Sequence, residues 1–470
     1  MNYNDIGFKA GLEIHQQLPQ RKLFSHEPTN IRKERPDFTI QRKLRARAGE
    51  SGDVDKAAQH EERKQKSFIY KGYHDTDSLV EIDEEPPHDP CPQAIETALT
   101  IAKLLHMDVV DSLQFMRKIV IDGSNVSGFQ RTGLIGTNGY IDLNGQRIGI
   151  ESLCLEEEAC QVIKRTSEKD VYNLSRLGIP LLEIATAPDI KTPQQCKDVA
   201  AHLGMLLRST EQVKRGIGTI RQDVNVSIKK GARTEIKGFQ DYRNIPAVVE
   251  NEVKRQKDLV KNGKDVTKTV RKAEEDNSTT YLRPMPGADR MYLETDIAPI
   301  RLRNKNVTIP KTITQRIQTY KETYNISRDI AKKAIKKELN TTFSFQPILE
   351  KYVSKNVTPT NIIELYTTKQ DQLDKKLFQE NIERILSYLT EGKISFNTVD
   401  KILEDLNETG NLTLEKYELL SKKELKKIIK EIIKENPDAP RGALMGMIMK
   451  KTKGKADGAQ ANRLLQELLE

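Results

Sequence analysis

The sequence lacks tryptophan, has few aromatic residues and contains only four cysteines among its 470 residues. No apolar run approaches the roughly 20 residues that a membrane-spanning helix needs. The N-terminal residues also lack the apolar core and basic flank of a signal peptide. Both absences favour a cytoplasmic protein that does not act at a membrane.

The cysteines (Cys91, Cys154, Cys160 and Cys196) show no Cys-x-x-Cys spacing and have no histidine pair nearby. This arrangement disfavours a zinc ribbon and a disulfide framework, so we expect buried free thiols. The motif Gly-x-x-x-x-Gly-Lys-[Ser/Thr] is absent as well, which excludes a P-loop. If the protein uses ATP, it must do so on another scaffold.

Charge is distributed unevenly along the chain, whose formal net charge is +9. Acidic clusters concentrate in the middle, at residues 81–85 and 151–158, whereas lysine runs concentrate after residue 330. An acidic site with a basic periphery suits a metal-using enzyme that acts on a polyanionic substrate. A solvated, lysine-rich surface is the alternative explanation of the lysine runs.

The length predicts two or three domains, and the patterning predicts an α+β fold. Up to about residue 300 we expect mixed or antiparallel strands joined by glycine-containing turns, with helices between them. The strands are expected at 8–18, 118–121, 140–150, 181–185 and 223–228, and the helices at 92–105 and after Thr192.

After residue 311 the lysine- and glutamate-rich sequence follows a helical period. We therefore divide the chain into a body (1–300), a helical domain (301–407) and a small helical tail (408–470). A polar, basic stretch at residues 25–71 has few apolar positions. It is expected to leave the body as a long loop, either functional or floppy.

Two strand-like segments and one acidic run, at residues 11–15, 180–184 and 155–158, carry the candidate chemistry. Side chains two apart on a strand project to the same face, so Glu13 and His15 are expected to point together. Carboxylates with an imidazole form a mostly oxygen-based site that suits Mg²⁺ bound to substrate phosphates.

Glu183 lies within an apolar strand, where an unpaired charge is costly. A cation shared with Glu13 would satisfy it, and so would an ion pair with an arginine or lysine; the sequence leaves both open. Asp223 shares a strand face with Arg221 and Asn225. Composition alone favours a solvated surface for that face.

Several segments together resemble one known family. They are residues 11–18 (GLEIHQQL), 82–88 (IDEEPPH), 117–125 (RKIVIDGSN), 128–132 (GFQRT), 155–159 (LEEEA), 173–183 (NLSRLGIPLLE), 221–225 (RQDVN), 446–450 (GMIMK) and 454–457 (GKAD). The chain is similar over essentially its whole length to the GatB/GatE family, the transamidase subunits of tRNA-dependent amidotransferases, and within it to the archaeal E type.

The resemblance implies a cradle-like catalytic body and a carbon–nitrogen ligase. Such an enzyme uses ATP and Mg²⁺ to phosphorylate the γ-carboxyl of glutamate esterified to tRNA(Gln), and ammonia then displaces phosphate. The metal ligands implied by position are Glu13, His15, Glu157 and Glu183. Lys118 and Asp223 match residues at the mouth of the family's ammonia passage.

The resemblance also implies an asparaginase-like D subunit as partner and ammonia source, in a heterodimer or a dimer of heterodimers. The C-terminal domain is expected to bind tRNA, with Lys450, Lys451, Lys453 and Lys455 as the candidate contacts. Archaeal E subunits usually carry an inserted domain, and we expect it to be missing here near residues 257–283. Any binding of tRNA by that insertion would then be missing too.

Three alternatives remain at this point. The chain could be a bacterial-type B subunit that also accepts Asp-tRNA(Asn), although residues 128–132 speak for the archaeal type. It could be a non-catalytic tRNA-binding factor whose acidic residues only stabilise the body. A metal-dependent nuclease or phosphatase is weakened by the single candidate cation cluster.

Overall fold

The structure is a computed structural model that describes residues 2–49, 52–239, 241–287, 290–293, 296–303, 305–452 and 455–469. The chain forms two compact units, Met1–Thr312 and Ile313–Glu470. The first combines sheets with helices and the second is helical, so the predicted α+β class is confirmed. No helix in the described ranges is long and apolar enough to cross a membrane.

The first unit is built around one large sheet. Its strands, from one edge to the other, are β15 (Thr279–Pro284), β14 (Thr269–Ala273), β13 (Thr234–Phe239), β12 (Ile220–Ser227), β1 (Lys9–Gln17), β11 (Pro180–Thr186), β8 (Gln146–Glu157), β7 (Phe129–Leu143), β6 (Phe115–Ile119) and β16 (Met291–Tyr292), with β4 (Asp108–Val109) beside β7. The N-terminal strand β1 is therefore central, and it pairs antiparallel with both neighbours.

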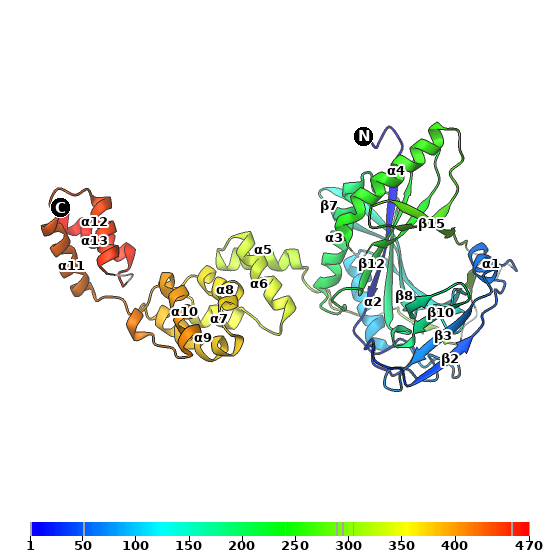
Figure 1. Cartoon of the computed structure of the whole chain (residues 1–470), viewed down its shortest axis with the longest axis horizontal. Helices are drawn as coiled ribbons and strands as arrows, with labels where there is room; N and C mark the ends of the chain where they lie inside the picture. Colours follow the sequence, from blue (N-terminus) through cyan, green and yellow to red (C-terminus); the bar gives the residue numbers. More distant parts are fainter. Residues whose placement is uncertain are drawn as a thin grey trace. The chain divides into compact units, whose positions relative to one another are not determined.

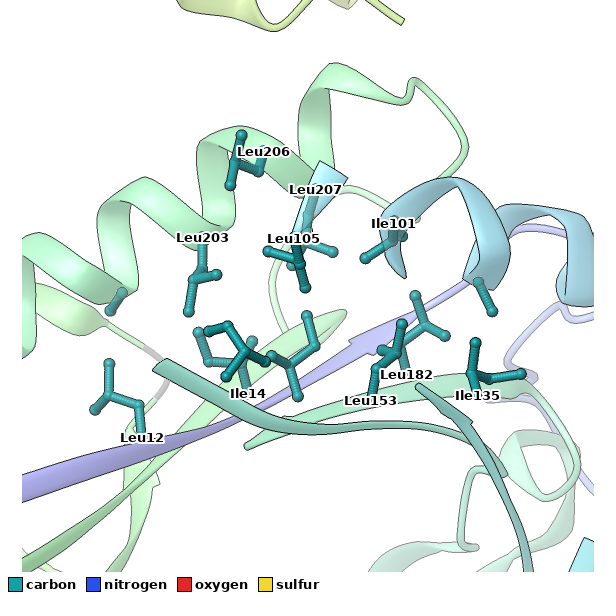
Figure 2. Packing of buried hydrophobic residues seen from close by; sticks show 14 of the residues in the cluster. Leu12, Ile14, Ile101, Leu105, Ile135, Leu153, Leu182, Leu203, Leu206 and Leu207 are labelled. Carbon is teal, nitrogen blue, oxygen red and sulfur yellow. The ribbon is translucent and has the colours of Figure 1, made fainter. Parts of the chain in front are cut away.

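Three helices cover one face of this sheet: α2 (Pro92–Leu104), α3 (Pro193–Ser209) and α4 (Ile245–Lys261) (Figure 1). Apolar side chains of the central strands face them. Leu12 and Ile14 of β1 pack with Leu203 of α3 and Ile101 of α2 in one buried cluster (Figure 2). Because strand side chains alternate, burial of Leu12 and Ile14 on this face sends Glu13 and His15 to the opposite face.

A smaller sheet belongs to the same unit and lies on the side away from α3 and α4 (Figure 1). Its order is β2 (Phe38–Arg42), β3 (Ser67–Gly72), β10 (Lys169–Asn173) and β9 (Gln161–Arg165). The basic stretch predicted as a loop therefore contributes two strands, β2 and β3. It also contributes the short helix α1 (Lys56–Glu62). A two-stranded pair of β5 (Ser112–Leu113) and β17 (Ile300–Arg301) completes the unit.

Most of the expected strands are present, with one informative difference. The expected strand at 140–150 is a hairpin between β7 and β8, because Asn144 and Gly145 both have positive φ values, 53° and 80°. A two-residue turn of this kind reverses an antiparallel chain. The expected helix starts are confirmed: Thr192 caps α3 through Gln195, and Pro92 opens α2.

The second unit contains nine α-helices in its described residues. They are α5 (Ile313–Tyr324), α6 (Arg328–Asn340), α7 (Gln346–Tyr352), α8 (Pro359–Thr367), α9 (Lys375–Thr390), α10 (Val399–Thr409), α11 (Lys422–Glu435), α12 (Arg441–Lys451) and α13 (Gly458–Leu469). The predicted capping box of α11 is present, since the side chains of Ser421 and Glu424 each accept a hydrogen bond from the other's backbone N–H.

Two hydrophobic cores lie within this second unit. One draws its buried residues from Ile326 to Leu414, and the other from Leu425 to Leu465. Each is closed by apolar stripes on helices whose other faces carry lysine and glutamate. The predicted division of the helical part at residue 407 remains a prediction.

Candidate functional site

The candidate site begins at β1, on the sheet face away from the helices. His15 Nε2 lies 3.3 Å from Glu13 Oε1 and 3.2 Å from Glu183 Oε2. His15 and Glu183 are directly opposite each other on β1 and β11, while Glu13 is opposite Asp223 on β12. Three neighbouring strands thus bring their polar side chains together. This proximity was predicted for Glu13, His15 and Glu183.

A lysine from β6 completes this cluster. Lys118 Nζ donates to Glu156 Oε1 at 2.9 Å and to Glu183 Oε2 at 3.2 Å. The ion pair that the sequence offered as a partner for Glu183 is therefore present, whereas a cation shared with Glu13 remains a prediction. Glu156 also accepts from the Thr132 hydroxyl and from the amide of Gln130.

Glu157, a predicted ligand, lies elsewhere. Its carboxylate accepts from the backbone N–H of Arg131 at 2.9 Å and pairs with the Arg131 guanidinium at 3.4 Å. It lines a separate small cavity together with Phe24 and Glu81. Of the two consecutive glutamates, the structure brings Glu156 to the cluster around His15 and leaves Glu157 outside it.

Strand alternation explains this difference. Leu155 is fully buried in the core beneath the helices. Residues two apart on a strand share a face, so Leu155 places Glu157 on the core side and Glu156 on the site side. That signal is present in the sequence at residues 155–157. The same rule predicted the common face of Glu13 and His15. Applied to this acidic run, it places Glu156, and not Glu157, on the face of the sheet that carries the site.

Asp223 lies on the other flank of β1. Its carboxylate accepts from Lys237 Nζ at 2.7 Å, and Lys237 also pairs with Glu235. Composition favoured a solvated surface here, but Asp223 is 2% exposed. The solvated surface that composition favoured is therefore wrong for Asp223, and its place at the mouth of an ammonia passage stays a prediction. Lys237 was not singled out in the sequence, since a lone lysine on a strand carries no signal of its own.

These groups line a cavity of about 200 Å³. Its walls include Glu13, His15, Lys118, Ser124, Asn125, Gln130, Glu156, Glu183, Arg221, Glu235, Lys237, Arg283 and Arg290. The side-chain nitrogens Asn125 Nδ2 and His15 Nδ1 are buried, and neither has a hydrogen-bond partner among the described residues. Buried polar groups are normally satisfied, so these two indicate places where a ligand completes the site.

The electrostatics reflect crowding of carboxylates around one imidazole. Burial and the nearby charge of Glu183 raise the pKa of Glu13. Burial disfavours the imidazolium, but the hydrogen bond to Glu183 outweighs it and raises the pKa of His15. Burial also opposes ionisation of Glu183, yet Lys118 and His15 hold its pKa well below the usual range. A protonated His15 can therefore neutralise its two neighbours.

The same atoms could hold a divalent cation. Single ligand atoms of His15, Glu156 and Glu183 lie within 4.8 Å of one another, as do those of Glu13, His15 and Asp223. His15 belongs to both groups. Carboxylate oxygens with one imidazole nitrogen fit Mg²⁺, which prefers few protein ligands and retains water or phosphate oxygens. The donor set fits the expected metal.

The candidate tRNA contacts lie in the second unit. Lys450 and Lys451 are exposed at the end of α12, and Lys455 is half-buried. The Lys451 ammonium lies 3.5 Å from the carboxylate of Glu431 on α11. Lys453 lies outside the described residues.

Comparison with known proteins agrees with this arrangement. Residues 8–308 match the family model described as the GatB/GatE catalytic domain, and residues 349–469 match the GatB domain. Over its whole length the chain is 36% identical to the E subunit of the glutamyl-tRNA(Gln) amidotransferase of Methanocaldococcus jannaschii, with 99% of that protein covered. The corresponding subunits of Thermococcus sibiricus and Archaeoglobus fulgidus are 32% and 33% identical, each over all of this chain and 99% of the relative.

The relatives are longer than this chain. The alignment with the Methanocaldococcus protein spans 629 positions against 470 residues here, a difference of 159. Near residues 257–283, where an inserted domain is expected to be missing, α4 is followed directly by the hairpin of β14 and β15. With its catalytic-domain match spanning the large sheet and its site, this chain belongs to the GatB/GatE family.

Proposed function

We propose that this chain is the transamidase subunit that converts Glu-tRNA(Gln) into Gln-tRNA(Gln) in the cytoplasm. The observation that carries the proposal is that ligand atoms of His15, Glu156 and Glu183 lie within 4.8 Å of one another, with Glu13 beside His15, in the wall of a cavity. The names of the full-length relatives support the substrate. A buried carboxylate cluster is costly to maintain for stability alone, which favours a functional role.

The reaction has two steps. First, a γ-carboxylate oxygen of the tRNA-bound glutamate attacks the γ-phosphorus of ATP; ADP leaves, and an acyl phosphate forms. Mg²⁺, when held by His15, Glu156 and Glu183 or Glu13, would neutralise charge on the transferring phosphoryl group. A free carboxylate is a poor acyl donor, so this step converts its oxygen into a good leaving group.

The residues of the chain contribute position and charge. Lys118 presents a buried ammonium to the cavity, and its carboxylate partners raise its pKa despite burial, which keeps it charged. The unpartnered amide of Asn125 can donate to an oxygen of the substrate. Such preorganised donors stabilise developing charge without reorganisation of solvent.

In the second step ammonia attacks the acyl carbon, the C–O bond to phosphate breaks, and inorganic phosphate leaves. The nucleophile must be NH₃, so a proton has to be taken from any ammonium that enters. Burial raises the pKa of Asp223, but Lys237 outweighs burial and lowers it, so Asp223 is an anionic acceptor close to Glu13. We propose that Asp223 and Lys118 flank the entry of ammonia supplied by an asparaginase-like D subunit.

The deciding experiment is conversion of labelled Glu-tRNA(Gln) by the full chain with ATP, Mg²⁺ and free ammonium, without the D subunit. Labelled glutaminyl product that depends on both ATP and Mg²⁺ is expected. Tight tRNA binding without ATP hydrolysis or product, under conditions in which the chain is folded, would instead identify a binding factor.

A further inference from the structure

A buried carboxylate that the proposed chemistry does not use lies just before α1. Asp55 is 2% exposed, and its oxygen Oδ2 accepts from the backbone N–H groups of Ala57 and Ala58 at 2.9 and 3.0 Å. These two bonds are those of an ordinary helix N-cap. The other oxygen, Oδ1, accepts from the backbone N–H of Gly287 at 2.9 Å, a residue 232 positions further along the chain. Asp55 therefore ties the start of α1 to a distant segment.

Gly287 lies in the connection between β15 and β16, which form the two opposite edges of the large sheet. We call this connection, residues 285–290, the crossover; the structure describes residues 285–287 and 290 of it. A flat sheet of the ten strands from β15 to β16 would be roughly 43 Å wide. The seven residue steps from the end of β15 to the start of β16 span at most about 25 Å. The sheet is therefore curled, and its edges approach each other on the side of the catalytic cavity, which Arg290 lines.

The crossover and the end of β15 bring two arginines to the catalytic cavity. Arg283 and Arg290 both line it, together with His15 and Glu183. Arg290 is close enough to Lys118 for the two positive charges to repel each other. In the described part of the chain, neither arginine forms a salt bridge. Guanidinium groups without a carboxylate partner in the wall of a cavity are suited to phosphate oxygens, which they bind through paired N–H groups.

Packing alone does not fix these two arginines. Helix α1 packs against β15 (Figure 1). A small cavity of about 50 Å³ lies beside α1, and its walls include Asp55, Arg283 and Arg290. Both arginines thus line two cavities, the small one and the catalytic one, so neighbouring atoms are missing on both sides of them. The hydrogen bond between Gly287 and Asp55 holds the backbone between the two arginines.

We propose that Asp55 is a positioning residue: through Gly287 it holds the crossover so that Arg283 and Arg290 present their guanidinium groups to the phosphoryl group transferred in the catalytic cavity. The inference deepens the proposed function and rests on it, because that reaction supplies the phosphoryl group. Asp55 acts through the backbone and makes no contact with the substrate. Donors that are in place before the reaction stabilise the charge that develops on the phosphoryl oxygens.

A purely structural role is the competing explanation, since Asp55 also caps α1. The two roles use different oxygens and can be separated. Serine and asparagine cap helices about as well as aspartate, but each offers a single acceptor oxygen. Asp55→Ser, and Asp55→Asn as a second variant, should therefore keep the cap and lose the bond from Gly287. Asp374→Ser is the matched control, because Asp374 caps α9 in the same way in the second unit.

Hydrogen–deuterium exchange of the full chain tests the hydrogen bond without catalysis. Within residues 284–287, Met285 and Gly287 carry a backbone N–H, because the other two residues are prolines. In both variants of Asp55 the amide of Gly287 should exchange at least about tenfold faster than in the wild type, while peptides from α1 keep their exchange rates.

Kinetics with ATP, Mg²⁺ and Glu-tRNA(Gln) test the consequence. Asp55→Ser should lower kcat for tRNA-stimulated ATP hydrolysis on the order of tenfold, with both KM values within about twofold, because the arginines act on the transferred group. In a background that carries Arg283→Gln and Arg290→Gln, Asp55→Ser should have little further effect on the residual rate, since residues that act through one another are not additive. Asp374→Ser should match the wild type.

Three results overturn the proposal: exchange at Gly287 is unchanged, kcat equals that of the wild type, or Asp55→Ser lowers kcat by the same factor with and without the two arginines. A rise of either KM at unchanged kcat also overturns it, because the arginines would then bind a phosphate of ATP or of tRNA that is not transferred. Failure of the proposed function looks different: the wild type hydrolyses no ATP in response to Glu-tRNA(Gln), while the exchange measurement still reports on the hydrogen bond.

Discussion

His15 and Glu183 lie directly opposite each other on the antiparallel strands β1 and β11, with 3.2 Å between His15 Nε2 and Glu183 Oε2. The register of the sheet, rather than a flexible loop, sets their separation. A slip of either strand by one residue would turn its own polar side chain into the hydrophobic core, so the apolar residues Ile14 and Leu182 hold the site in place.

Removing the charge of Glu183 tests the metal-binding role. Glu183→Gln preserves the size of the side chain but removes an anionic ligand, so tRNA-stimulated ATP hydrolysis should fall by at least about 100-fold. Glu13→Gln should act in the same direction. Affinity for tRNA, measured by filter binding, should remain within about twofold for both variants, since neither residue lies on a basic surface. Full activity of Glu183→Gln at limiting Mg²⁺ would contradict this role.

Glu156 and Glu157 should respond differently to the same substitution. Glu156→Gln is expected to reduce transamidation strongly; it weakens a buried ion pair, but Lys118 keeps Glu183 as a second carboxylate partner, so its cost in stability should be the smaller of the two. Glu157→Gln leaves the buried Arg131 without its carboxylate, so it should lower the free energy of unfolding by on the order of 3 kcal/mol. Urea denaturation and product formation, measured on both variants, separate the two effects. The reverse pattern would mean that Glu157, as the resemblance implied, holds the ion.

Asp223→Asn should uncouple the two steps. Phosphorylation does not need Asp223, so ATP hydrolysis in the presence of Glu-tRNA(Gln) should persist. Amidation with free ammonium should slow by roughly 100-fold, the lower range for loss of a general base. The ratio of ADP to Gln-tRNA measures the uncoupling, and a parallel loss of both products would argue against a role limited to ammonia.

Glu158 makes stability depend on pH. Burial opposes its ionisation, but Arg221 and Arg176 outweigh burial and lower its pKa from 4.5 to about 2. A carboxyl whose pKa is depressed on folding contributes stability above its unfolded pKa and loses it as the pH falls through the folded pKa. Glu158→Gln should thus cost about 1–3 kcal/mol near neutral pH. This difference from the wild type should shrink between pH 4.5 and about 2. Denaturant titrations across this range provide the measurement.

The tail lysines are expected to contribute to tRNA affinity rather than to catalysis. Replacing Lys450, Lys451 and Lys453 with glutamine should weaken binding and reduce the log–log salt slope by about 0.7–0.9 for each phosphate that these lysines neutralise. The rate at saturating tRNA should be unchanged. Affinity equal to that of the wild type over a salt series would remove the tail from the tRNA-binding surface.

Much of the site could be predicted because short-range rules govern it. Alternation on β1 sent Glu13 and His15 to one face, and the burial of Glu183 required a partner, which Lys118 and His15 supply. Helix starts at Thr192 and Ser421 followed from side chains that satisfy free backbone N–H groups.

The remaining features depend on long-range pairing, which local patterns do not encode. The order of strands that places β1 between β11 and β12 is one example, and it is this order that brings Asp223 beside Glu13. The buried ion pair of Lys22 and Asp77, with 2.9 Å between Nζ and Oδ1, is another example. Both residue types are common on protein surfaces, and only the folded structure excludes water from this pair. The cavity lined by Lys43, Arg45 and Arg117 likewise arises where residues 43–48 meet β6 and β7.

The central position of β1 has a consequence for synthesis of the chain. Both of its neighbours lie far downstream: Glu183 follows His15 by 168 positions in the sequence, and Arg221 comes still later. Until the ribosome has released residues beyond 227, the first strand has exposed edges and an uncovered apolar face. Nascent chains that stop before β12 should therefore be the species that engage chaperones, and no centre built from His15 and Glu183 can exist before β11 has emerged.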